Sequence, residues 1–212
     1  VDNDTTRAIR QAVSATEKYA LGQGETFYRM EFLPRRTCMD TALFGYRGIT
    51  SFASSNPYNT TLFMGAMGYA VNGVNSYMYK SFMPPCDSLL GIRYVMLESN
   101  LTNNAYLRQI DSITVGDESP VTYYIYENEL ALPVAYRVNS TVKDWQSEFY
   151  NPMNTQNSLF TAMTGDTRPM YTAVPIAAAE GYEGNVTFNS DTSFNILATG
   201  TTTIAATVKE AG

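Results

Sequence analysis

The sequence contains no histidine, and this absence excludes more chemistry than any other feature of its composition. Without an imidazole there is no Ser-His or Cys-His nucleophile system, no histidine acid–base step and none of the common zinc-ligand sets. Charge is also scarce, because charged residues make up 16% of the 212 residues and hydrophobic residues 44%. That balance is typical of a globular chain with a real core.

Cysteine is nearly absent as well, since Cys38 and Cys86 are the two copies in the chain. Their separation fits neither a CxxC redox motif nor a metal knuckle. In an oxidising compartment they could form one disulfide, and the alternative is a pair of free thiols. We expect no metal site and no cofactor.

Positive charge is too sparse for a nucleic-acid partner. The chain has 14 Lys and Arg against 20 Asp and Glu, with a net charge of -6 and a pI near 4.7. The basic residues are scattered, so no stripe exists that could neutralise a run of phosphates. We therefore exclude nucleic acid as a partner.

Long hydrophobic runs are missing too. From Gly48 to Tyr79 the chain carries no charge, but Asn and Pro residues interrupt this stretch, and Leu62–Val71 is its densest apolar part. Such a run is too short to cross a bilayer and predicts a buried helix. The opening residues, Val1–Asp4, are acidic and polar, unlike a signal peptide.

Periodicity predicts an α+β fold, with a mixed sheet and flanking helices. Helical spacing or capping predicts helices at 5–21, 40–44, 59–67, 88–90, 142–150 and 155–163, the last stopped by Gly165. Alternation predicts strands at 27–32, 49–54, 93–98, 107–113, 121–126 and 135–138, and residues 72–82 are expected to form a loop.

The composition changes beyond Tyr171, where Thr, Val, Ala and Gly prevail and charge becomes rare. This pattern is typical of short strands separated by Gly turns. We therefore expect a mixed α/β domain over residues 1–168. Residues 169–212 are expected to form a β-rich, sandwich-like segment, either the start of a β-sandwich or packed on the first domain.

The carboxylates give no clear catalytic pair. Glu31 follows Arg29 on the same predicted strand face, which indicates a local ion pair or a solvated face, and Asp87 has the chemistry of a helix cap. A secreted hydrolase that uses two carboxylates remains an alternative, and it would need an open cleft with two close acids.

A cluster of uncharged polar residues is the best binding candidate. Ser54, Ser55 and Asn56 lie beside a predicted strand end, with Tyr46 and Arg47 nearby in the sequence. Loops at strand ends often carry binding groups, so contact with a carbohydrate or a lipid headgroup is one interpretation. Plain hydrogen bonding within the loop is the other.

Five stretches occur in a recognisable order. They are Phe27–Glu31, Gly45–Asn56, Asp87–Val95, Ile125–Pro133 and Asn151–Asn157. Together they resemble the extracytoplasmic region of YfhO-type bacterial membrane proteins. Within them, Gly48 and Gly91 are expected at turns or close approaches, Tyr46 and Tyr94 in the core, and Asn128 and Pro133 in turns.

The resemblance implies a multi-spanning protein of the glycosyltransferase-C kind, linked to glycosylation of lipoteichoic acid in Gram-positive bacteria. The acidic catalytic residue of that class is expected in a loop between membrane helices, so the resemblance assigns no catalytic residue here. It implies an accessory domain on the extracytoplasmic side of the cell membrane. Its partners would be its own transmembrane region and a cell-envelope glycopolymer or lipid-linked sugar. A stand-alone cell-surface carbohydrate-binding module is the alternative.

Overall fold

The computed structural model describes residues 4–33, 35–101, 104–117, 119–148 and 151–172, and the backbone of four strands beyond them. The chain divides into two compact units, Val1–Met170 and Tyr171–Gly212. In the first unit the helices are α1 (Asp4–Gly22), α2 (Asp40–Phe44), α3 (Tyr58–Ala66), α4 (Pro84–Leu89), η1 (Ser140–Asp144) and α5 (Pro152–Thr164). Its strands are β1 (Arg29–Leu33), β2 (Ser51–Phe52), β3 (Ala70–Val71), β4 (Ser76–Met78), β5 (Ile92–Leu97), β6 (Leu107–Val115) and β7 (Val121–Asn128).

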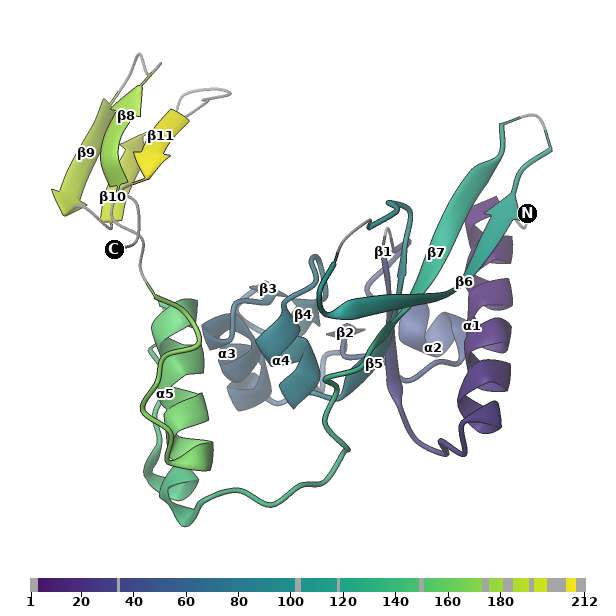
Figure 1. Ribbon diagram of the computed structural model, residues 1–212, viewed down its shortest axis with the longest axis horizontal. Helices are drawn as coiled ribbons and strands as arrows, with labels where there is room; N and C mark the ends of the chain where they lie inside the picture. The colour runs from purple at the N-terminus through teal and green to yellow at the C-terminus, as the bar shows by residue number, and fades with distance from the viewer. Residues whose placement is uncertain are drawn as a thin grey trace. The chain divides into compact units, whose positions relative to one another are not determined.

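The centre of the first unit is a four-stranded mixed sheet in the order β1-β5-β7-β6. Strand β1 is parallel to β5, whereas β7 is antiparallel to both of its neighbours. Helix α1 covers one face of this sheet (Figure 1), and its apolar stripe packs against Met30, Phe32, Tyr94 and Met96. These residues alternate along β1 and β5, so one face of both strands belongs to this part of the core.

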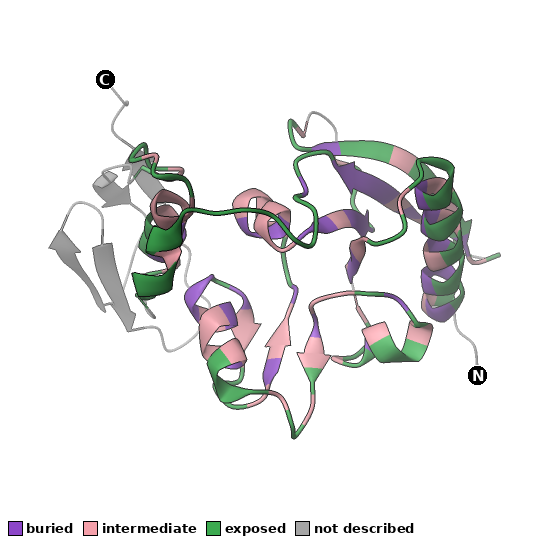
Figure 2. Ribbon diagram, turned by 90° about the horizontal axis from the view of Figure 1, so that it is seen from below, coloured by how far each residue is buried: buried purple, intermediate pink, exposed green. Residues whose placement is uncertain are grey.

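The opposite face of the sheet is covered by a smaller lobe (Figure 2). This lobe consists of a three-stranded antiparallel sheet, β2-β4-β3, with helices α3 and α4. Val95 and Leu97 of β5 pack against Met64, Met67 and Tyr79 of the lobe. Both faces of β1 and β5 are therefore buried. This explains why the central positions of β1, Met30, Glu31 and Phe32, are all buried instead of alternating.

Most long elements confirm the sequence predictions, and the α+β class is confirmed. Helix α1, the short α2, strands β5, β6 and β7, and helix α5 with Gly165 as its left-handed C-cap all lie where they were expected. Helix α3 follows Pro57 at its N-cap instead of starting at Asn59.

Other segments differ from the predictions. Residues 135–138 form no strand, and of the predicted helix 142–150 the described residues, 142–148, contain only the end of a 3-10 helix, η1. The expected loop 72–82 contains β4, whose pairing partners in β2 and β3 were invisible to a local pattern. Short strands of two or three residues depend on such partners more than on their own periodicity.

The described backbone of the second unit forms the strands β8 (Ile176–Glu180), β9 (Asn185–Ser190), β10 (Ser193–Leu197) and β11 (Ala205–Val208). They form two antiparallel pairs, β9 with β10 and β8 with β11. The β-rich character expected for this part of the sequence is confirmed.

Candidate functional site

The predicted binding residues Tyr46, Arg47, Ser54, Ser55 and Asn56 have different environments in the structure. Tyr46 is a core side chain beside α1, as the sequence suggested, and its burial raises the pKa of its hydroxyl. Arg47 is exposed, with its guanidinium carbon 4.8 Å from the centre of the Phe27 ring. The Ser54–Asn56 loop belongs to the small sheet instead.

In that loop, Asn56 has an architectural role. Its side-chain amide donates to the Ser51 hydroxyl at 3.1 Å and to the backbone carbonyl of Asn75 at 2.8 Å, so it ties the loop to the β3–β4 hairpin. Ser54 and Ser55 are exposed. Of this triplet, the two serines are therefore the ones placed to meet a ligand.

Both cysteines are free thiols. Cys38 Sγ lies 3.1 Å from the sulfur of Met78, and Cys86 is fully buried in the lobe core. Burial, with the adjacent Asp87 carboxylate as the second cause, raises the pKa of the Cys86 thiol to about 12. A thiol held protonated in this way is a poor nucleophile.

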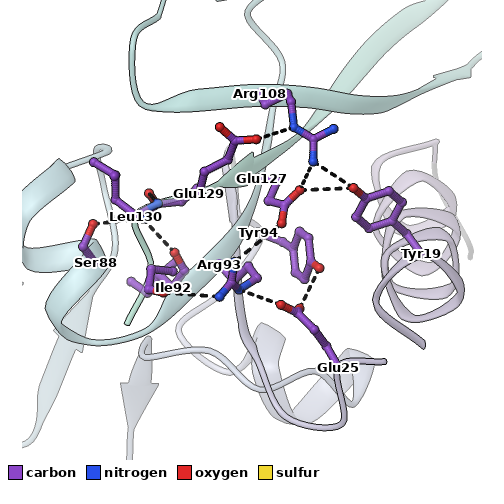
Figure 3. Close-up of polar contacts among 12 residues, drawn as sticks. Tyr19, Glu25, Ser88, Ile92, Arg93, Tyr94, Arg108, Glu127, Glu129 and Leu130 are labelled. Carbon is purple, nitrogen blue, oxygen red and sulfur yellow. Dashed lines mark hydrogen bonds and ion pairs between the residues drawn. The ribbon is translucent and has the colours of Figure 1, made fainter. Parts of the chain in front are cut away.

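A cluster of five charged side chains lies at one end of the main sheet (Figure 3). This charged cluster contains Glu25 from the α1–β1 loop, Arg93 of β5, Arg108 of β6, Glu127 of β7 and Glu129 just after it. The sheet register creates it, because Arg108 and Glu127 are direct cross-strand partners and Glu127 also faces Tyr94.

Glu127 is the centre of the charged cluster. One carboxylate oxygen lies 3.5 Å from the Arg93 guanidinium, and the other accepts hydrogen bonds from Arg108 and, at 3.1 Å, from the Tyr19 hydroxyl. Its side chain is 10% exposed, so these partners replace nearly all of its water. A buried carboxylate needs such compensation.

The remaining contacts connect this centre to α1 and to solvent. Arg93 binds Glu25 at 3.0 Å, and Glu25 in turn accepts a 2.8 Å hydrogen bond from Tyr94. Burial, followed by that hydrogen bond, raises the pKa of the Tyr94 hydroxyl. Arg108 binds Glu129 at 2.6 Å, and the two side chains are 50% and 59% exposed.

This geometry suits binding better than acid–base catalysis. A two-carboxylate hydrolase needs acids that face each other across an open space, whereas the Arg93 guanidinium lies between Glu25 and Glu127 and binds both. At the exposed edge beside Tyr19, Arg108 Nη1 remains to donate to a hydroxyl-rich or phosphate-bearing ligand, and Glu129 offers an acceptor.

Two further carboxylates are buried where the lobe meets the main sheet. Glu31, in β1, accepts hydrogen bonds from the amides of Ile49 and Thr50 and from the Thr50 hydroxyl. Burial raises the pKa of Glu31 to about 7, although these hydrogen bonds lower it. The expected ion pair with Arg29 is wrong, because Arg29 donates to the carbonyl of Leu90 instead.

Gly48 makes this contact with Glu31 possible. A Cβ at position 48 would lie 2.7 Å from a Glu31 carboxylate oxygen and 2.7 Å from a Thr41 methyl carbon. The expectation of a close approach at Gly48 is confirmed. Gly91 has a φ of +66°, a left-handed conformation that favours glycine, so its expected place at a turn is also confirmed.

Asp87 is the second buried acid. Within α4 it accepts hydrogen bonds from the hydroxyls of Tyr79 at 2.8 Å and Tyr69 at 3.0 Å, and from the amide of Met83 at 3.0 Å. The sequence predicted Asp87 as the cap of a helix that starts after it, and this is wrong, because α4 begins at Pro84 with Met83 as its N-cap residue and Asp87 lies inside the helix. Burial raises the pKa of Asp87 to about 7, against the three hydrogen bonds.

Sequence reasoning missed the charged cluster and the burial of Glu31. The sequence places Arg108 in one predicted strand and Glu127 directly after another, but their pairing depends on the register between the two strands. In the part of the chain that the structure describes, no group of three or more Cys, Asp or Glu side chains is placed to hold a metal ion.

Comparison with known proteins identifies one family. The family model described as bacterial membrane protein YfhO matches residues 2–211. No curated protein and no solved structure matches the chain. Among the helices of the described residues, none has the length and apolar character needed to cross a membrane.

Proposed function

The chain belongs to the YfhO family of bacterial membrane proteins, and we propose that it forms an extracytoplasmic, water-exposed domain of a membrane glycosyltransferase that modifies a cell-envelope polymer. Its role is to position the acceptor polymer or to cover the membrane-embedded site, and lipoteichoic acid is the acceptor that the resemblance implies. The family match over residues 2–211 is the observation that carries this proposal.

The use made of the buried acids supports an accessory role. Glu31, Asp87 and Glu127 each accept hydrogen bonds from two or three groups of their own fold. A carboxylate held in this way stabilises the structure and has little freedom to exchange a proton with a substrate. In the proposed protein, the transfer chemistry belongs to residues of the membrane-embedded region.

The exposed edge of the charged cluster is the surface best suited to an acceptor. Arg108 can donate from its Nη1 to a phosphate oxygen, because its Nε and Nη2 already donate to Glu129, Glu127 and Tyr19, and Glu129 can accept from sugar or glycerol hydroxyls. Tyr19 supplies an aromatic ring with a hydroxyl that already contacts Arg108 at 2.9 Å. These three side chains therefore offer the two kinds of contact that a polyol-phosphate polymer needs.

The test is a glycosylation assay in membranes that contain the complete protein. Arg108→Gln and Glu129→Gln should each lower transfer to the acceptor. Arg168→Gln is the matched control, because Arg168 forms a comparable exposed pair with Asp166 at 2.6 Å elsewhere in the chain. Normal transfer by a protein that carries both cluster substitutions would contradict acceptor positioning, and normal transfer without residues 4–170 would contradict the accessory role altogether.

A stand-alone carbohydrate-binding module is the second candidate. The observation that favours it is the exposure of Tyr58, Ser54 and Ser55 within five positions of the sequence, because an aromatic ring can stack on a sugar and hydroxyls can hydrogen-bond it. It predicts binding of the isolated chain to cell-wall glycans in calorimetry, lost on Tyr58→Ala. Because Asn56 and Tyr46 have structural roles, substitutions there would not test it.

A further inference from the structure

The segment Gly48–Tyr79 has no charged residue, although charged residues make up 16% of the chain. It forms β2, α3, β3 and β4 of the lobe. Two of its loops meet at one end of the small sheet, because Phe52 pairs with Ser76 and the Ala53 amide donates to the Asn75 carbonyl at 3.4 Å. We call this end, residues 52–58 and 72–76, the uncharged tip.

The uncharged tip exposes large apolar side chains. Phe52 is 47% exposed, Tyr58 58% and Val74 63%, and Figure 2 shows the exposed loops at the ends of the lobe strands. An isolated exposed apolar residue is ordinary on a protein surface. Here three of them share one end of a small sheet that has no charge to hold water around them.

Most amides of the hairpin at residues 72–76 donate to groups of the hairpin itself. The Asn72 side-chain oxygen accepts 2.9 Å hydrogen bonds from the amides of Val74, Asn75 and Ser76, and the Asn72 amide donates to the Ser76 carbonyl at 3.2 Å. Asn56 donates to the Asn75 carbonyl. Unpaired polar groups are the main cost of placing a loop against lipid. Because most amides of this hairpin already have acceptors, removing water from it leaves few unpaired donors.

We infer that the uncharged tip rests in the interfacial layer of a lipid bilayer, with Phe52, Tyr58 and Val74 inserted. Three independent features fit that partner: exposed aromatic and aliphatic side chains, a hairpin in which four of the five amides of residues 72–76 donate to groups of the hairpin itself, and membership in a family of membrane proteins. The absence of basic residues fits uncharged lipid headgroups, because anionic lipids attract Lys and Arg. The inference rests on the family, not on acceptor handling at Arg108.

The experiment compares two exposed phenylalanines. Phe52 and Phe27 are 47% and 48% exposed, and only Phe52 belongs to the uncharged tip. Phe52→Trp and Phe27→Trp are each made together with Trp145→Phe, so that the introduced indole is the one present. The chains are tethered by a terminal affinity tag to phosphatidylcholine vesicles with brominated acyl chains, which quench an inserted tryptophan.

Insertion predicts a blue-shifted and quenched emission for Trp at position 52 and an unchanged emission at position 27. Equal behaviour of the two variants would overturn the inference. A response at position 52 to soluble cell-wall glycan, without quenching by brominated lipid, would also overturn it and would favour sugar binding at the same tip.

Partitioning of the untethered chain provides a second measurement. Phe52→Ser and Val74→Ser should each lower the partition coefficient for phosphatidylcholine vesicles about tenfold, because each removes the burial of one large apolar side chain. Phe27→Ser should leave it unchanged. Binding by the parent chain should not weaken at high salt, and a strong salt dependence would contradict the uncharged contact.

Discussion

At the charged cluster, Glu127 pairs with the guanidinium groups of Arg93 and Arg108, whereas Glu31 and Asp87, beside the uncharged segment Gly48–Tyr79, accept hydrogen bonds from neutral amides and hydroxyls. Burial raises the pKa of both lobe acids to about 7, and the hydrogen bonds from these neutral donors offset that rise in part. The anchoring of the lobe therefore responds to pH, while the charged cluster responds to salt.

The largest effect is expected at the lobe anchor. Asp87→Ala would leave the Tyr69 and Tyr79 hydroxyls and the Met83 amide without their buried acceptor. Each orphaned donor is costly, and we expect a loss of about 3–5 kcal/mol in the free energy of unfolding. Urea denaturation measures it, with the exposed Asp117→Ala as a control expected within about 0.5 kcal/mol. If Asp87→Ala lowered the free energy of unfolding no more than Asp117→Ala does, Asp87 would not anchor the lobe.

The pH dependence of stability comes next. Because the folded-state pKa of Glu31 lies near 7, above the ordinary value of 4.5, the folded chain retains a proton that the unfolded chain releases at lower pH. The free energy of unfolding should therefore fall as pH rises from about 5 to about 7, by up to roughly 3 kcal/mol for this group.

Glu31→Gln and Asp87→Asn separate the two contributions to that dependence. Each substitution removes one titrating group, so each should flatten the slope of stability between pH 5 and 7, and the double variant should flatten it most. Thermal unfolding over a pH series gives the slope. An unchanged slope in the double variant would assign the pH dependence to other groups.

A smaller difference separates two acids of the charged cluster. Glu127→Ala removes a carboxylate that is 10% exposed and is shared by Arg93, Arg108 and Tyr19, so we expect a loss of about 2 kcal/mol. Glu129→Ala removes a carboxylate that is 59% exposed and should cost less than about 0.5 kcal/mol. Equal costs in chemical denaturation would show that burial does not decide the strength of these contacts.

The smallest effect concerns the exposed pair. A double-mutant cycle on Arg108→Ala and Glu129→Ala should give a coupling energy below about 1 kcal/mol, because both side chains remain in contact with water. The coupling should fade in 1 M salt. A coupling that survives high salt would place this pair, like Glu127, among the shielded contacts.

Sequence reasoning was strongest where the pattern was long. Helix α1 and strands β5 to β7 were predicted because many residues repeat one periodicity. It was weakest at β3 and β4, which pair through two or three residues. For the candidate site, the polar character of Ser54 and Ser55 was visible, but the assembly of Glu25, Arg93 and Arg108 around Glu127 needs the register of four separate segments.

By itself the sequence determined the α+β class, the absence of imidazole chemistry, the missing charge between Gly48 and Tyr79 and the family. These follow from composition, periodicity and motif order, which are properties of the chain as written. Only the tertiary structure decided that Glu31 is buried beside Gly48 and not paired with Arg29. The environment of a side chain is set by what packs over its strand from elsewhere in the chain, and no local pattern records that.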